Sequence, residues 1–438
     1  MNMNESIPAD AAVMPVAEDA VSASSWYALA VLTLISACHF LDRTMVSIIV
    51  EPVRKEFLLN DSQIGLLTGL AYGATFAIAG IPIGLLIDRV NRVRLMAALV
   101  CIWSAMTALT GFAQSYIHLL VARMGVGASE AGGQPTCMSL IADLFPASRR
   151  STAVGYLFLS TGTGALASVF IGGFMSAHYG WRTAMMMAGI PGIILAVLFV
   201  LTVRHPMRGA MEAGHIRAPA EKAASVGEVL RYVRDNAAMR NLLLGMCFAV
   251  GGVSAIGAWL PSYMMRFHSF TIKEAGFSIA LAGGIFPSLG SLLGGFISDK
   301  LAKTHARRRM DLASFTCLLA AGFAVCGMLA TVAFGALGLL CMTMMCIFVA
   351  FPAAYGNMLS ITAPNMRGST AATLQVCTNL VGYGMGPLAV GMLSDFYGGP
   401  QSLRYAIMTM AGICLILSSL HFALSARALD RLLGRKPL

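Results

Sequence analysis

Four full charges lie inside stretches of sequence that are otherwise apolar enough to enter lipid. Asp42 and Arg43 interrupt the apolar run from 26 to 50, and Arg123 and Glu130 interrupt the run from about 118 to 145. A charge near the centre of a bilayer costs at least roughly 2.5–3.5 kcal/mol on insertion scales, so such residues are expected to face a protein interior or a wet cavity. The four side chains therefore indicate a transport pathway.

The spacing of these charges places each set on one face of a helix. His39, Asp42 and Arg43 stand at i, i+3 and i+4, and Arg123 and Glu130 are two helical turns apart. Burial raises the pKa of a carboxyl group and a nearby arginine lowers it, so a helix movement that exchanges these influences would load and release a proton. We predict that Asp42 and Glu130 couple transport to protons, while Arg43 and Arg123 switch their pKa or bind an anionic headgroup.

Two alternatives remain open for this cluster. The four charges could form a static salt-bridge lock that only holds helices together, and His39 could be a packed core histidine instead of a proton relay. Further side chains are candidates for a cavity lining, each with ordinary packing as the alternative: His39, Trp259, Tyr263, Tyr355, Asn357, Gln375 and Asn379.

The composition is that of a membrane protein. Hydrophobic residues make up 57% of the 438, charged residues 11%, and the mean hydropathy is +0.75, whereas soluble domains carry about 25% charged residues. The 10 cysteines lie in apolar segments with no CxxC or Cys/His cluster, so we expect no disulfide, metal site or cofactor. Residues 1–25 lack the basic start of a signal peptide and are expected to form a disordered cytoplasmic tail.

Helical spans need about 20 mostly apolar residues, and the sequence offers twelve such windows. They are 26–50, 62–87, 94–113, 117–145, 150–177, 183–203, 240–265, 274–299, 311–332, 335–361, 367–396 and 402–426. The loops after the even-numbered windows, with the C-terminal tail, hold 22 Lys and Arg, against 6 in the loops after the odd-numbered ones. The positive-inside rule therefore predicts that both termini are cytoplasmic. The net charge of +10 is an orientation signal with anionic lipid headgroups as its partner, and no nucleic acid partner is expected.

The longest connection, 204–239, divides the chain into two halves of six spans, 26–203 and 240–426, followed by a cytoplasmic tail at 427–438. Apolar residues at helical spacing between 226 and 237 predict a short helix on the cytoplasmic membrane surface, with a mobile linker as the alternative. No charge lies comparably deep in the second half, so we expect proton coupling to be confined to the first half. The second half would contribute mainly shape, aromatic and amide contacts.

An internal repeat relates the two halves. A shift of 218 residues superposes Ser151-Thr-Ala on Ser369-Thr-Ala and Tyr179-Gly on Tyr397-Gly, and a shift of 211 superposes Gly84-x-x-x-Asp88 on Gly295-x-x-x-Asp299. Six spans separate the copies, so both keep one orientation in the membrane. The sequence predicts an all-α membrane protein of two six-helix bundles related by a pseudo-two-fold axis along the membrane normal, with a site between them.

Two motifs resemble those of the major facilitator superfamily and of its spinster-type transporters. The superfamily loop motif reads here as Gly84-Leu-Leu-Ile-Asp88-Arg89-Val-Asn91-Arg92-Val93-Arg94, with Asn91 in place of the usual Gly. The spinster-like signature reads as Arg123-Met-Gly125-Val-Gly127-Ala-Ser129-Glu130-Ala-Gly132-Gly133-Gln-Pro135, with Ser129 in place of Gly.

This resemblance implies the major facilitator fold and proton-driven transport, by alternating access, of lipid-like amphiphiles such as lysophospholipids or sphingoid-base phosphates. A transporter of small organic anions is the nearest alternative, because Arg43 and Arg123 suit a carboxylate. A proton-independent lipid scramblase is another, and an intramembrane enzyme is disfavoured because GxSG and HExxH motifs are missing. We expect a monomer in a prokaryotic inner membrane.

The loop motif also suggests a conformational role. Asp88 would lie near the positive N-terminus of the eleventh span, and Arg92 would pair with Asp143 at the inner end of the fourth. Both contacts would break when the cytoplasmic face opens; solvated charges that anchor a loop are the alternative. The remaining members of the motif and its copy are Gly84, Arg89, Gly295, Asp299 and Lys300.

Overall fold

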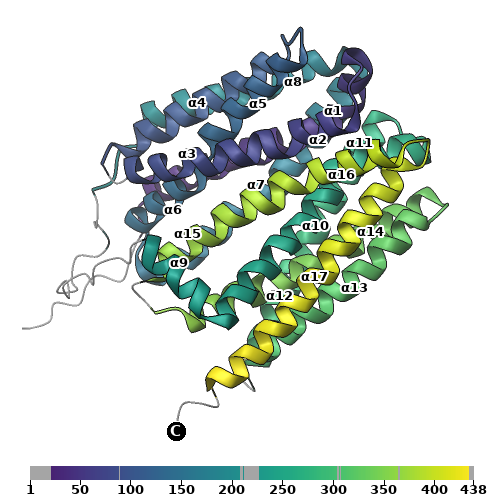
Figure 1. Ribbon diagram of the computed structural model, residues 1–438. Coiled ribbons are helices and arrows are strands. Elements are labelled where there is room, and N and C mark those ends of the chain that lie inside the picture. The colour runs from purple at the N-terminus through teal and green to yellow at the C-terminus, as the bar shows by residue number, and fades with distance from the viewer. Residues whose placement is uncertain are drawn as a thin grey trace, which may run out of the picture.

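The computed structural model describes residues 21–87, 89–207, 211, 226–302, 305, 307–363 and 366–433, and the secondary structure of these residues is helical. Figure 1 shows the helices as two groups, the first half in purple to blue and the second in green to yellow, lying side by side. We name the two ends of the molecule by their residues. The Asp61 end is where α2 begins, and the Arg92 end is where α4 begins.

The first half runs from α1 to α8 and contains two π-helical segments. Its elements are α1 Ala23–Phe57, α2 Asp61–Gly65, η1 Leu66–Leu70, α3 Ala71–Ile87, α4 Arg92–Thr110, α5 Tyr116–Glu130, α6 Gly133–Leu144, α7 Ala147–Ser168, η2 Val169–Met175 and α8 Ser176–Thr202.

The second half follows a separate short helix, α9 Val226–Asp235. Its elements are α10 Ala237–His268, α11 Ile272–Ile279, η3 Ala280–Ile285, α12 Phe286–Ala302, α13 Arg307–Leu329, α14 Ala333–Ile361, α15 Arg367–Cys377, η5 Thr378–Gly384, α16 Met385–Tyr397 and α17 Ser402–Leu433.

Ten helical stretches of the described chain are long and apolar enough to cross a membrane, and the two remaining predicted spans have simple explanations. One stretch, Ala153–Thr202, contains two spans, because Gly180 adopts φ 84° and ψ 161° and reverses the chain there. The fourth span is divided into α5 and α6, each too short to count alone. With these two, the twelve predicted spans are present.

The break between α5 and α6 follows from the local sequence. Ala131 and Gly132 form a turn directly after Glu130, and Pro135 in the first turn of α6 lacks the N–H that would continue the helical hydrogen bonds. A Cβ on Gly132 would lie 2.5 Å from side-chain atoms of Ile83 and Leu99. The sequence thus ends α5 at Glu130, and neighbouring helices pack tightly against the turn.

The predicted repeat is visible in the helix irregularities. Within the described residues, π-helical segments interrupt the second, fifth, eighth and eleventh spans, at η1, η2, η3 and η5. These are the spans that the sequence repeat pairs with each other. They also carry contacts between the halves, since α16 packs on α2 and η1, and α11 packs on η2. Irregular helical turns of this kind mark positions where helices bend.

Glycines bring the second and eleventh spans into backbone contact. A Cβ on Gly65 would lie 2.5 Å from the Pro387 carbonyl oxygen, and one on Gly69 would lie 2.6 Å from that of Gly384. These two glycines are one helical turn apart and face the same partner. Small residues allow membrane helices to approach this closely, so the seam leaves no room for a side chain.

The hydrophobic core shows that the halves meet mainly at the Asp61 end. There, one cluster of buried side chains draws on both halves, with Ile49 and Met185 from the first and Ile256 and Val390 from the second. Toward the Arg92 end the clusters are separate: one contains only first-half residues, and the other contains only residues from 229 to 426. Among the described residues, the two halves thus share a core at one end of the molecule only.

The short helix predicted in the connection is present as α9. Its Val229 and Val233 are buried against the second half, and the Tyr232 hydroxyl donates a 2.6 Å hydrogen bond to the Ile361 carbonyl oxygen at the end of α14. Leu230 is exposed. This helix is therefore fastened to the Arg92 end of the second half.

We predict that Gly69→Ala destabilises the protein, because the new methyl group would overlap the Gly384 carbonyl oxygen. Overpacking of this kind costs about 1–3 kcal/mol, which should lower the thermal unfolding midpoint in detergent. Gly338→Ala is the matched control, since nothing lies within 4 Å of its Cβ position. Equal midpoints for the two variants would contradict the tight seam.

Candidate functional site

Tyr72, near the start of α3, organises the cluster of buried charges. Its ring lies 5.3 Å from the Arg43 guanidinium carbon and 4.6 Å from that of Arg123, measured to the ring centroid. Its hydroxyl donates a 2.7 Å hydrogen bond to Glu130 Oε2. One aromatic side chain therefore links three of the four predicted charges. The sequence analysis missed it, because a tyrosine in an apolar helix has no distinguishing pattern.

A close helix contact holds Tyr72 in this position. A Cβ on Gly127 of α5 would lie 2.6 Å from the Tyr72 carbonyl oxygen, so α3 and α5 touch through their backbones beside the cluster. Gly127 stands between Arg123 and Glu130 on the same helix. Gly127 of the spinster-like signature is therefore needed for this close approach of the two helices.

Glu130 is the most enclosed member of the cluster, with 1% of its surface exposed. Its Oε2 atom also lies 3.2 Å from His39 Nε2, whereas Oε1 has no hydrogen-bond partner among the described residues. His39 and Tyr72 approach the carboxylate from α1 and α3. His39 therefore belongs to the charged cluster.

Asp42 is buried without a strong partner. Only 2% of its surface is exposed, and neither carboxylate oxygen makes a well-formed hydrogen bond with the described residues. Glu130, Arg123 and the Thr107 hydroxyl act on it electrostatically. Burying an ionised carboxylate is costly unless it is paired and hydrogen-bonded, so the charge state of Asp42 affects the stability of this arrangement.

Arg43 connects the cluster to the second half. Its guanidinium carbon lies 3.7 Å from the ring centroid of Tyr383, which belongs to η5, so the guanidinium contacts the rings of both Tyr72 and Tyr383. Arg43 Nη2 and Arg123 Nε are buried and have no hydrogen-bond partner among the described residues. Aromatic faces hold the cations while N–H groups stay available for an anion.

A cavity of about 150 Å³ lies between the halves beside these arginines. Its wall is mainly apolar, with hydroxyl groups near the charges, and both halves contribute to it. The lining residues are Phe40, Arg43, Thr44, Ser47, Thr68, Tyr72, Arg123, Val253, Ser254, Gly257, Ala258, Leu260, Ile279, Ala282, Gly283, Pro287, Met344, Phe348, Tyr383 and Pro387.

The residues predicted for a cavity lining lie elsewhere in this conformation. Trp259 and Tyr263 are fully buried; Trp259 donates a 3.1 Å hydrogen bond to the Pro387 carbonyl oxygen, and Tyr263 donates one of 3.1 Å to that of Gly327. Both side chains fill the packing around α10, where their polar atoms find backbone acceptors.

The other predicted residues, Gln375 included, are not among those that line the central cavity. Asn379 is buried and donates to the Gln375 carbonyl oxygen of its own helix. Asn357 is fully buried, and Tyr355 is 40% exposed on α14. His39 lines a second space inside the first half. Asn357 and Asn379 are thus buried in this state, whereas Tyr355 is exposed.

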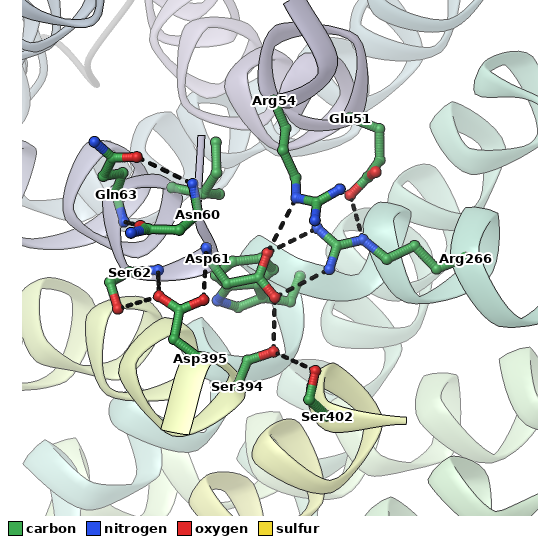
Figure 2. A network of polar contacts seen from close by, with 12 residues as sticks. Glu51, Arg54, Asn60, Asp61, Ser62, Gln63, Arg266, Ser394, Asp395 and Ser402 are labelled. Atoms are coloured by element: carbon green, nitrogen blue, oxygen red, sulfur yellow. Dashed lines mark hydrogen bonds and ion pairs between the residues drawn. The ribbon is translucent and has the colours of Figure 1, made fainter. Parts of the chain in front are cut away.

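A polar network joins the halves at the Asp61 end, as Figure 2 shows. Arg266 of α10 donates two hydrogen bonds of 3.0 Å to the Asp61 carboxylate and one of 2.7 Å to Glu51 of α1. Ser394 donates to Asp61 at 2.6 Å, and Arg54 Nε lies 3.3 Å from it. We call these residues, together with Asp395, the inter-half network.

Asp395 completes this network by capping a helix of the other half. Its carboxylate accepts hydrogen bonds from the backbone N–H groups of Asp61 at 3.0 Å and Ser62 at 2.8 Å, and from the Ser62 hydroxyl at 2.5 Å. The first N–H groups of a helix lack partners within it, and the helix dipole favours an anion there. The start of α2 is therefore held by a carboxylate from α16 (Figure 2).

A family model described as Major Facilitator Superfamily matches residues 32–383, which is more than half of the chain. The chain belongs to the major facilitator superfamily. It is therefore a multi-pass membrane protein and a secondary transporter, not an enzyme.

Three proteins show how this superfamily member relates to others. An MFS-type efflux pump of Mycolicibacterium smegmatis is 27% identical over 412 residues, covering 92% of this chain and 93% of that protein. A probable L-galactonate transporter of Escherichia coli is 26% identical over 382 residues, covering 84% and 83%. The crystal structure of a bacterial homologue of the human lysosomal transporter Spinster, inward-facing and unoccupied, matches with a TM-score of 0.84 at 26% identity, covering 94% and 98%. The predicted spinster-like resemblance is confirmed.

The superfamily loop motif is partly described. Arg92 and Asp143 form the predicted ion pair, with Nη1 and Oδ2 2.5 Å apart, and Arg92 also donates to the Ser139 hydroxyl at 2.9 Å. Asp88 lies outside the described residues, as does the side chain of Asp299. The predicted contact of Asp88 with the eleventh span stays a prediction.

The two copies of this superfamily motif have similar surroundings where they are described. Arg89 and Lys300 are exposed. Gly84 and Gly295 both have open space at the position of a Cβ. Neither glycine is required by close packing in this conformation.

We predict that Arg266→Gln separates the halves at the Asp61 end, because it leaves Glu51 and Asp61 without their shared cation. Removing one partner of a buried ion pair costs about 3–5 kcal/mol, which is comparable with the few kcal/mol that separate alternative conformations. Distances between spin labels on noncanonical amino acids at Leu58 and Thr331, both in connections at this end, should lengthen.

Arg307→Gln is the control for this measurement. It breaks an exposed ion pair with Asp430 inside the second half, so the label distances should stay unchanged. Unchanged distances in Arg266→Gln as well would show that the inter-half network does not hold the two halves together.

Proposed function

We propose that this protein is a proton-coupled transporter of an amphiphilic, lipid-like substrate with an anionic headgroup, such as a lysophospholipid or a sphingoid-type phosphate. The central cavity carries the argument. Arg43 and Arg123 line one side of it and each has a buried N–H group without a partner among the described residues. Val253, Ile279 and Phe348 contribute to its apolar wall. An anionic headgroup would bind the N–H groups of the arginines, and an acyl or alkyl chain would lie along the apolar wall.

The conformation supports transport by alternating access. The shared core and the inter-half network lie at the Asp61 end, about 12 Å along α1 from Arg43 to Glu51 at 1.5 Å per residue. The halves keep separate cores toward the Arg92 end. The positive-inside rule predicts that this end is cytoplasmic, so we interpret this state as inward-facing. The Arg92–Asp143 pair is intact in it, so under this interpretation the expectation that the pair breaks when the cytoplasmic face opens does not hold.

Proton coupling is supported by the surroundings of the two buried carboxylates. Asp42 and Glu130 interact with each other and with Arg123, while the Tyr72 hydroxyl reaches Glu130 from the cavity wall. The positive charges of Arg43 and Arg123 favour the ionised form of the two carboxylates. An anionic headgroup beside these arginines would offset that charge and so favour protonation of a carboxylate. Binding of substrate and binding of a proton would therefore depend on each other.

Transport of a small organic anion is the second candidate. The likeness to a probable L-galactonate transporter favours it, and the same arginines suit a carboxylate. The two candidates differ in their use of the apolar wall, which only an amphiphile needs.

We predict that Asp42→Asn and Glu130→Gln each abolish substrate accumulation driven by a pH gradient, because each variant lacks one of the two carboxylates whose titration the coupling requires. The measurement is uptake of lysophosphatidylglycerol into proteoliposomes with and without the gradient. Glu56→Gln is the control, since Glu56 is an exposed partner of Arg182 in the same half and should keep coupling intact. Full gradient-driven uptake in both test variants would overturn the assignment.

We predict that Arg123→Gln weakens binding of lysophosphatidylglycerol by roughly 10- to 100-fold. A hydrogen bond to a charged group contributes about 1.5–3 kcal/mol, and each 1.4 kcal/mol is about tenfold in affinity. The measurement is ligand-dependent thermal stabilisation in detergent, with exposed Arg94→Gln as the control.

Phe348→Ala distinguishes the two candidate substrates in the same assay. Shortening the apolar wall should weaken binding of lysophosphatidylglycerol but leave binding of galacturonate unchanged. Stabilisation by galacturonate alone, insensitive to Phe348→Ala, would favour the small-anion transporter.

A further inference from the structure

A second cavity, also of about 150 Å³, lies inside the first half between α1, α4, α6 and α7. Its polar lining consists of Ser36, His39, Gln134, Ser160 and Thr161. Phe40 is the one residue that it shares with the lining of the central cavity. The two spaces are therefore distinct, and the helices of the second half do not line this one.

Glu130 lies between the two cavities. Tyr72, which lines the central cavity, and His39, which lines the second, both contact its Oε2 atom. The Glu130 side chain itself has no exposed surface, whereas 29% of the His39 side chain is exposed. Among the described residues that line the second cavity, His39 is thus the one that makes a polar contact with this carboxylate.

We propose that the second cavity delivers protons to Glu130 through His39, by a route separate from the substrate site. This inference rests on the proposed proton coupling. A proton from water in the cavity binds the free imidazole nitrogen, and the proton on the nitrogen beside Glu130 passes to Oε2. This transfer leaves a neutral imidazole that carries its proton on the other ring nitrogen, and a later tautomer exchange restores the starting form. The net change is one protonated carboxylic acid.

The cavity has the size and polarity to hold water. At about 30 Å³ per water molecule, a space of this volume accommodates several, and the hydroxyl groups of Ser160 and Thr161 and the Gln134 amide offer hydrogen bonds. Gln134 is exposed. It stands at the start of α6, which runs from the turn after Glu130 toward Asp143, the partner of Arg92. Protons would therefore enter from the predicted cytoplasmic side.

The charged and titratable groups around His39 come from a few elements only. Trp103 of α4 packs edge-on against the imidazole, with centroids 6.3 Å apart, and fixes its direction. The lining residues of α4 and α7 carry no titratable group. The groups from the other neighbouring elements are Cys38, Asp42 and Arg43 of α1, Tyr72 of α3, Arg123 and Glu130 of α5, and Cys137 of α6.

The test follows protonation of Glu130 directly, in the full-length protein without substrate. Time-resolved infrared spectroscopy after an acidic pH jump reports the carboxylic C=O band, and Glu130→Gln identifies the part of the signal that belongs to this residue. In His39→Gln the amide still donates to Glu130 but does not relay protons. The rate of Glu130 protonation should then fall about tenfold or more, a barrier change of about 1.4 kcal/mol.

A matched pair of variants tests the route without touching His39. Thr161→Leu fills the second cavity and should slow protonation as His39→Gln does, whereas Thr68→Leu fills the central cavity and should leave the rate unchanged. Unaltered rates in Thr161→Leu, or slowing by Thr68→Leu alone, would overturn the route and leave Glu130 as a coupling group. A wild-type protein without a Glu130 band at any pH would overturn both the route and the assignment of Glu130.

Discussion

The arrangement of the first half depends on the contact of one tyrosine with three buried charges. Two guanidinium groups and a carboxylate cannot remain in an apolar interior unless each finds compensation. Tyr72 offers its ring to Arg43 and Arg123 and its hydroxyl to Glu130. The glycine contact between α3 and α5 and the end of α5 at Glu130 both serve to bring these groups within reach of that ring.

The shared core at the Asp61 end gives this cluster its conformational setting. Apolar side chains of both halves pack together there, and the inter-half network adds directional contacts that fix which residues face each other. Burial of apolar surface is non-directional, so packing alone would tolerate sliding between the halves. The bidentate contact of Arg266 with Asp61 and the cap from Asp395 to α2 restrict that sliding.

The sequence predicted those features that have a strong signal in composition or spacing. Charges in apolar helices identified Asp42, Arg43, Arg123 and Glu130, the repeat gave the two halves, and the loop motif gave the pair of Arg92 with Asp143. Tyr72 and Tyr383 were missed because aromatic residues are ordinary in membrane helices, and only the packing shows which of them meet a guanidinium. Trp259 and Tyr263 were candidates for a cavity lining but are buried in the packing. Residue type alone does not reveal which side of a helix faces a cavity.

The sequence predicted that the second half contributes mainly shape, aromatic and amide contacts, and its eleventh span supplies both an aromatic ring and a carboxylate. Tyr383 lies near the end of η5 and Asp395 near the end of α16, about 18 Å apart along this segment at 1.5 Å per residue. Tyr383 contacts Arg43 in the charged cluster, and Asp395 caps α2 at the Asp61 end. Because helices transmit displacement along their length, a movement of this segment away from the first half alters both contacts together. An anionic group that competed for Arg43 would therefore act on the same element that caps α2 at the Asp61 end.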